Sequence, residues 1–105
     1  LISETGDYVT VKSDKKIYKI NHPDILYLES IRDYVKIHTG NGIVISPETL
    51  RNYEKTLPPG EFIRVHKSFI ISLNHLNYIE GNQVAIADVM IPVGKSYRDK
   101  LRNIL

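Results

Sequence analysis

The sequence predicts a mostly β fold with one short internal helix and a C-terminal helix. Two observations carry this prediction: short runs of β-branched and aromatic residues recur along most of the chain, and residues that favour turns separate them. The chain has 105 residues, of which 42% are hydrophobic and 25% charged. These values are typical of one soluble globular domain. No apolar run approaches the roughly 18 residues that a membrane-spanning helix needs.

The expected strands are short and follow one another closely. They cover residues 8–12, 15–20, 25–29, 34–39, 43–45, 62–66, 76–80, 83–87 and 90–93. Residues 25–29 carry apolar groups on both faces, as a central strand requires, whereas residues 34–39 alternate, with Val35 and Ile37 on one face. Turns between neighbouring strands are predicted at residues 13–14, 40–42, 81–82 and 87–89.

Helical spacing occurs in two places. Ser46 can cap a first helix that begins at Pro47 and ends before Pro58, and its apolar face is expected to be buried. The residues of that face are Leu50, Tyr53 and Leu57. Ser96 and Asp99 have the spacing of a capping box for a second helix, which should pack on the sheet by one apolar face. That face consists of Tyr97, Leu101, Ile104 and Leu105.

The residue types of a catalytic or metal site are absent or scattered. The chain has no cysteine, its four histidines lack the spacing of metal ligands, and its glycines form no phosphate-binding fingerprint. We therefore expect no enzyme activity, no metal and no cofactor. The lack of cysteine favours an intracellular, cytoplasmic setting. The polar start without an initiator methionine predicts a linker remnant over residues 1–7, left from a longer protein, and a single domain over residues 8–105.

The net charge of +2 is small, but the charge is distributed unevenly. Residues 1–61 hold 8 Lys and Arg against 9 Asp and Glu, whereas residues 62–105 hold 6 against 3. The C-terminal basic residues form two clusters, which are Arg64, His66 and Lys67, and Lys95, Arg98, Lys100 and Arg102. Such clusters bind polyanions or only solubilise the surface, and counts alone do not separate the two.

The motif with the clearest chemical content is FIRVHKSF, at residues 62–69. In a strand, Arg64 and His66 would point away from the core, and Lys67 and Ser68 would open the following turn. These groups suit phosphate oxygens and the acceptors of guanine in the major groove. An ordinary loop in which His66 caps a backbone carbonyl explains the same residues equally well.

Four motifs in order resemble the LytTR family of bacterial DNA-binding domains, over residues 8–105. They are ILYLE at 25–29 followed by YVKIHT at 34–39, ETLRNYEKTL at 48–57, FIRVHKSFII at 62–71, and IPVGKSY at 91–97. The third is the most diagnostic, because members typically read F-x-R-x-H-[RK]-S-[FY] there. The resemblance implies short, mostly antiparallel strands in more than one sheet, and DNA recognition by loops between strands rather than by an inserted helix.

The resemblance also implies which residues contact DNA. Base contacts in the major groove are expected from Lys67 and Lys95, and Arg32 is the candidate in a third contact loop at residues 30–33. Arg64, His66 and Ser68 are expected to position the backbone, with Arg64 and His66 partly structural. Further interface candidates are Tyr34, Ser96 and Arg98.

Members of the family usually follow a phosphoacceptor receiver domain in the same chain, and two copies bind repeated promoter elements. The resemblance thus implies transcription regulation by the output domain of a two-component response regulator, with double-stranded promoter DNA as partner and a homodimer on that DNA. Two alternatives remain. One is a β-rich protein-interaction domain that has lost DNA binding, which the near-neutral charge supports. The other is a nonspecific RNA or single-strand binder, for which Tyr34 beside Lys36 is the one outward stacking pair.

Overall fold

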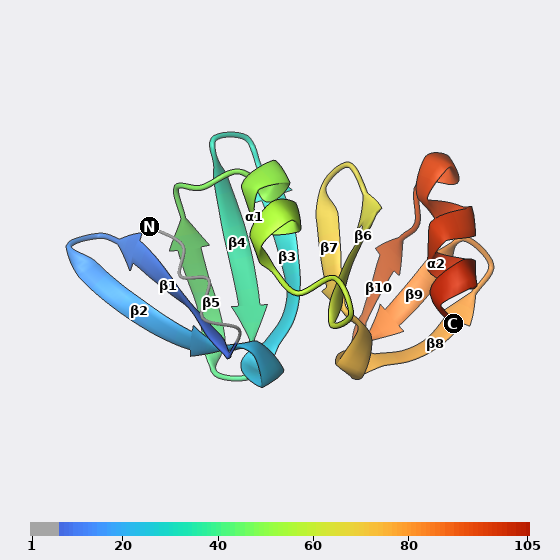
Figure 1. The fold of residues 1–105 in the computed structure, drawn as a ribbon, viewed down its shortest axis with the longest axis horizontal. Helices are drawn as coiled ribbons and strands as arrows, with labels where there is room; N and C mark the ends of the chain where they lie inside the picture. The colour runs from blue at the N-terminus through green and yellow to red at the C-terminus, as the bar shows by residue number, and fades with distance from the viewer. Residues whose placement is uncertain (1–6) are drawn as a thin grey trace.

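The strands of this protein form three antiparallel sheets in the computed structural model, which describes residues 7–105 (Figure 1). The two-stranded sheet contains β1 (Tyr8–Ser13) and β2 (Lys16–Asn21). The five-stranded sheet has the order β5-β4-β3-β7-β6, with β3 (Ile25–Ile31), β4 (Tyr34–Thr39), β5 (Gly42–Ser46), β6 (Phe62–His66) and β7 (Phe69–Ser72). The three-stranded sheet has the order β10-β9-β8, with β8 (Leu76–Glu80), β9 (Gln83–Ile86) and β10 (Val89–Pro92). The predicted mostly β fold with more than one sheet is confirmed.

Helical structure is short and connects or follows the strands. The two α-helices are α1 (Leu50–Thr56) and α2 (Arg98–Ile104). Single 3-10 turns precede β3, β8 and α2, and these are η1 (His22–Asp24), η2 (Leu73–His75) and η3 (Lys95–Tyr97).

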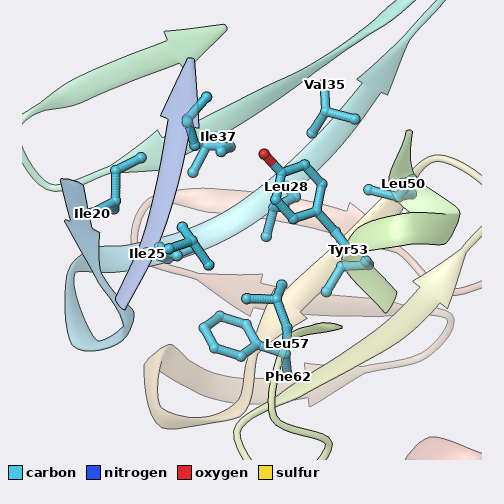
Figure 2. Packing of buried hydrophobic residues seen from close by; sticks show 12 residues of the cluster. Ile20, Ile25, Leu28, Val35, Ile37, Leu50, Tyr53, Leu57 and Phe62 are labelled. Carbon is cyan, nitrogen blue, oxygen red and sulfur yellow. The ribbon is translucent and has the colours of Figure 1, made fainter. Parts of the chain in front are cut away.

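The five-stranded sheet separates two hydrophobic cores because alternate residues of its strands point to opposite faces. On β7, Ile70 belongs to the first core and Ile71 to the second. The first core lies between this sheet, the β1–β2 hairpin and α1 (Figure 2). The second lies between this sheet, the three-stranded sheet and α2. The prediction of a central strand at residues 25–29 is confirmed, since β3 has neighbours on both edges and side chains in both cores.

The first helix begins three residues later than the sequence predicts. Ser46 still pairs with Val35 as the last residue of β5, so its backbone is extended and it does not cap the helix. Thr49 is the N-cap instead, and its Oγ1 accepts a hydrogen bond from the Asn52 amide at 3.1 Å. The buried Ser46 hydroxyl oxygen accepts from the Tyr53 hydroxyl at 2.7 Å. The predicted apolar face of this helix is confirmed, because its three residues are all buried in the first core.

The predicted capping box of the second helix is wrong. The η3 turn runs through Ser96, and α2 follows with Tyr97 at the N-cap position and no side-chain cap. Leu101 is buried in the second core and Tyr97 packs against it, but Ile104 and Leu105 are 46% and 67% exposed. The buried face of this helix is therefore about half as long as predicted, because the last two residues of the chain do not pack against the second core.

Two turns differ from the prediction by one residue. The first hairpin turns at Asp14 and Lys15, whose φ angles are 50° and 67°, while Ser13 remains paired with Lys16. Two consecutive positive φ angles are the conformation of a type I′ loop, which fits the twist of a two-stranded ribbon. Before β10 the predicted turn at residues 87–89 is one residue shorter: Ala87, with a φ of 52°, lies in the turn as predicted, but Val89 already pairs with Ile86 in β10.

The predicted linker falls mainly outside the described residues. Residues 1–6 lie there, and Asp7 is described, with its carbonyl oxygen accepting a hydrogen bond from the His22 amide at 3.0 Å. No helix in residues 7–105 is long and apolar enough to cross a membrane.

Candidate nucleic-acid interface

Three segments that the sequence singles out lie along one edge of the molecule, at the top in Figure 1. They are the β3–β4 turn with Arg32, the β6–β7 turn with Lys67, and the segment after β10 with Lys95. Two backbone hydrogen bonds join them. The Ser30 amide donates to the Ser68 carbonyl at 2.8 Å, and the Gly94 amide donates to the Val65 carbonyl at 2.7 Å. Residues distant in the sequence are thereby fixed side by side.

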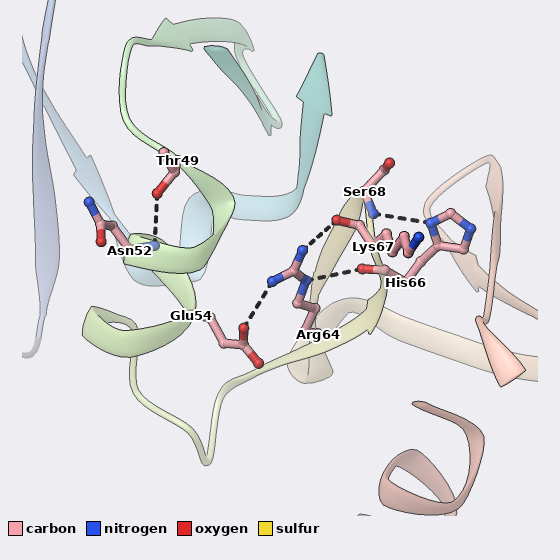
Figure 3. A network of polar contacts seen from close by, with 7 residues as sticks. All are labelled: Thr49, Asn52, Glu54, Arg64, His66, Lys67 and Ser68. Atoms are coloured by element: carbon pink, nitrogen blue, oxygen red, sulfur yellow. Dashed lines mark hydrogen bonds and ion pairs between the residues drawn. The ribbon is translucent and has the colours of Figure 1, made fainter. Parts of the chain in front are cut away.

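Arg64 holds the β6–β7 turn together from beneath (Figure 3). Its Nε donates to the His66 carbonyl at 3.2 Å and one terminal nitrogen donates to the Lys67 carbonyl at 2.5 Å. The other terminal nitrogen forms an ion pair with Glu54 of α1 at 3.0 Å. All three guanidinium nitrogens therefore have protein partners, which fits the partly structural role expected of Arg64.

His66 also stabilises the β6–β7 turn. Its Nδ1 accepts a hydrogen bond from the Ser68 amide at 3.1 Å, so Nδ1 carries no proton in this arrangement. Its ring contacts Phe69 edge to face, with the ring centroids 5.7 Å apart. The sequence also allowed an ordinary loop in which His66 caps a backbone carbonyl. His66 does bind the backbone of its own turn, but its partner is the Ser68 amide and not a carbonyl. Lys67, at the tip, is exposed.

Arg32 occupies an unusual backbone conformation. Ile31 pairs with Tyr34, so the predicted contact loop at 30–33 is a two-residue turn of Arg32 and Asp33. Arg32 has φ of 50°, a region that residues with a Cβ seldom adopt, and its side chain is exposed. Strained residues of this kind cluster at functional sites.

Gly94 permits the close approach of the third segment. A Cβ at this position would lie 3.0 Å from Cδ2 of Tyr97 and 3.7 Å from Cα of His66. The tight contact is with the Tyr97 ring, and the hydrogen bond from the Gly94 amide to the Val65 carbonyl of β6 sets Lys95 beside the β6–β7 turn. Lys95 and Ser96 are exposed in η3, whereas Arg98 is half-buried and its Nε is buried without a hydrogen-bond partner among residues 7–105.

A cleft of about 420 Å³ lies between the β3–β4 turn and α1, and we call it the arginine cleft. Tyr34, which the sequence places in the interface, is one of its walls. The other lining residues are Ser30, Arg32, Asp33, Val35, Glu48, Thr49, Leu50, Arg51 and Arg64. Sequence reasoning missed Arg51, because it stands next to the buried Leu50 in a helix that was assigned to the core alone. The signal that could have found it is its place on the polar side of that amphipathic helix.

The side chains with clearly shifted pKa values lie in the cores and not in the turns. Burial, partly offset by the hydrogen bond to Ser46, raises the pKa of Tyr53 to about 12. Burial and then the charge of Glu29 raise the pKa of Tyr27, whose ring stacks on His38 with centroids 4.1 Å apart. Across residues 7–105, no three or more His, Cys, Asp or Glu residues are grouped so as to hold a metal ion. The functional groups at the edge formed by the three turns are lysine and arginine cations, backbone amides and serine hydroxyls.

Comparisons with known proteins identify relatives of this chain. The family model described as the LytTr DNA-binding domain matches residues 15–105. The CO-responsive transcriptional regulator RcoM of Rhodospirillum rubrum is 31% identical over 88 residues, which are 77% of this chain and 37% of that protein. The sensory transduction protein LytT of Bacillus anthracis is 30% identical over 98 residues, which are 88% of this chain and 40% of that protein.

The fold has a counterpart among solved structures. A LytTr DNA-binding domain from Bacillus cereus superposes with a TM-score of 0.83 at 24% identity, covering 93% of this chain and 95% of that one. The chain thus matches nearly all of a solved domain, while it spans 37% and 40% of the two curated relatives.

Proposed function

Because the chain belongs to the LytTR family of DNA-binding domains, we propose that it binds double-stranded promoter DNA sequence-specifically, with its inter-strand turns in the major groove. The observation that carries this proposal is the joining of three turns, each with an exposed cation, along one edge by backbone hydrogen bonds. Side chains on a fixed frame can meet several base pairs in one register, which is what sequence readout requires.

Each turn contributes one base-reading cation in this proposal. Lys67, Lys95 and Arg32 stand at the tips, and lysine or arginine donates to the O6 and N7 acceptors of guanine. The lysine ammonium is a point donor without the fork of a guanidinium, so the two lysines discriminate bases less sharply than arginines would.

The remaining candidates contact phosphates or shape the turns. Ser68, Ser96 and the free Nε2 of His66 can donate to phosphate oxygens beside the bases. Arg64 positions the tip of the β6–β7 turn through its two carbonyl contacts. Tyr34 lines the arginine cleft next to the β3–β4 turn, and the half-buried Arg98 begins α2 directly after η3.

At the level of the whole protein, we propose the output domain of a two-component response regulator. Two curated relatives bear the names of a sensory transduction protein and a transcriptional regulator, and each is much longer than the part matched here. A receiver domain in the same chain would then control pairing of two copies on repeated promoter elements. The β-rich protein-interaction domain is the alternative that the following experiment separates from this proposal.

Footprinting of the domain on the DNA upstream of its own gene, at two salt concentrations, tests the proposal. We expect protection of two similar elements in the same groove register, with affinity falling steeply as salt rises because phosphate contacts release counterions. A protein-interaction domain would protect no element at either salt concentration, and that result would refute the proposal.

A further inference from the structure

We propose that the arginine cleft is a phosphate site in which Arg51 and Arg32 hold a phosphodiester of the bound DNA. This inference rests on the proposed function and extends the interface to α1, an element outside the three turns. Its chemistry is that of a phosphate group, so a free phosphate ester is the competing source that the experiment must separate.

Two guanidinium groups in the cleft are open. Arg32 and Arg51 are exposed, and neither side chain has a hydrogen bond or ion pair within residues 7–105. Arg64 lines the same cleft, but its nitrogens already have partners. An unpaired guanidinium presents five donors in a planar fork that matches the oxygens of a phosphate. The guanidinium N–H donors of Arg32 and Arg51 are therefore available to a ligand in the cleft.

The residues that line the cleft carry a formal excess of one positive charge, because three arginines stand against the two carboxylates Asp33 and Glu48. Glu48 keeps its negative charge, but it is held against α1, where its Oε1 accepts hydrogen bonds from the Asn52 side-chain amide at 2.6 Å and from the Thr49 amide at 3.3 Å. Asp33 is the one lining carboxylate without such a partner in the described part of the chain. Thr49 uses its hydroxyl oxygen as an acceptor, so its O–H proton is free to donate to a phosphate.

The cleft lies next to the turn that carries Lys67, and this position favours DNA as the source of the phosphate. Ser30 lines the cleft and its amide donates to Ser68, directly beside the exposed Lys67. Duplex DNA carries one negative charge per about 1.7 Å of its axis, so a base contact by Lys67 brings phosphates close to this side of the turn. The cleft and the turn would then be contacted by the same duplex.

Arg51→Gln tests the inference, with Lys55→Gln as the matched control. Lys55 lies one turn further along the same helix, is exposed, and does not line the cleft. Binding to the footprinted promoter fragment and to a random duplex is measured by fluorescence anisotropy at several salt concentrations, and thermal melts check the fold. We expect Arg51→Gln to weaken binding to both duplexes about three- to ten-fold and to lower the salt slope by about 1, while Lys55→Gln binds like the wild type.

Three results would overturn the inference. Equal affinities and slopes for Arg51→Gln and Lys55→Gln, with a wild type that binds DNA, would refute this inference alone. NMR shifts at Arg51 on titration with inorganic phosphate at constant ionic strength, together with unchanged DNA binding by Arg51→Gln, would assign the cleft to a free phosphate ester. Failure of the wild type to bind either duplex would refute the proposed function and this inference with it.

Discussion

Replacing Arg64 with methionine should destabilise the β6–β7 turn and weaken DNA binding without removing a DNA contact. Methionine keeps an apolar stem of similar length but loses the donors to the His66 and Lys67 carbonyls and to Glu54. A hydrogen bond from a charged donor contributes about 1.5–3 kcal/mol, but the Arg64 side chain is 18% exposed and the freed carbonyls regain water. The two carbonyl contacts then contribute about 1–2 kcal/mol together. The ion pair adds at most about 1 kcal/mol, because the Glu54 side chain is 38% exposed.

Urea denaturation should therefore show a loss of about 2 kcal/mol for Arg64→Met and of less than about 1 kcal/mol for the control Glu54→Gln. DNA anisotropy should show a larger loss on the promoter fragment than on random DNA, because the tip that carries Lys67 is no longer held. The salt slope should stay unchanged. A stable Arg64→Met variant whose salt slope falls by about 1 would refute this reasoning, because it would place the guanidinium on a phosphate.

Three further predictions concern single residues. Lys95→Ala should weaken promoter binding in anisotropy assays while the thermal melt stays unchanged, and Lys95→Arg should retain or improve it because the fork grips guanine. Because glycine adopts the φ of Arg32 freely, Arg32→Gly should keep the free energy of unfolding within about 1 kcal/mol of wild type but weaken DNA binding; loss of stability with unchanged binding would contradict this. Burial raises the pKa of Tyr53 to about 12 from 10.0, so the unfolded state loses this proton first and the free energy of unfolding should fall by about 1 kcal/mol per pH unit between pH 10 and the folded-state pKa. Urea titrations of Tyr53→Phe should lack this part of the loss.

The strands could be predicted from the sequence because their side-chain period is local. The alternation of residues 34–39 and the double-sided apolar run at 25–29 both survive in β4 and β3. The helix starts were predicted less well, because the position of an N-cap depends on where the preceding strand ends. Ser46 has the residue type of a cap, but its pairing with Val35 keeps its backbone extended, and Thr49 takes the role.

The candidate site could be predicted in its parts but not in its arrangement. The motif at residues 62–69 indicated Lys67, and nothing in its spacing showed that Arg64 is used by the backbone of its own turn. The hydrogen bond between Ser30 and Ser68 joins residues far apart in the sequence, so only the fold brings their two turns together. Arg51 was missed because its helix was assigned to the core alone, and the facing wall of its cleft comes from another hairpin.

Base reading by exposed turn residues is tested most directly by the ratio of promoter to random-DNA affinity for Lys67→Ala. Lys67 is exposed at the tip of the β6–β7 turn and its side chain has no ion pair within residues 7–105, so its loss should leave the fold unchanged. We expect promoter binding to weaken by about 1–3 kcal/mol and random-DNA binding by much less, which lowers the ratio. Equal losses on both duplexes would show that Lys67 contacts phosphate only, and no loss on either would remove this turn from the interface.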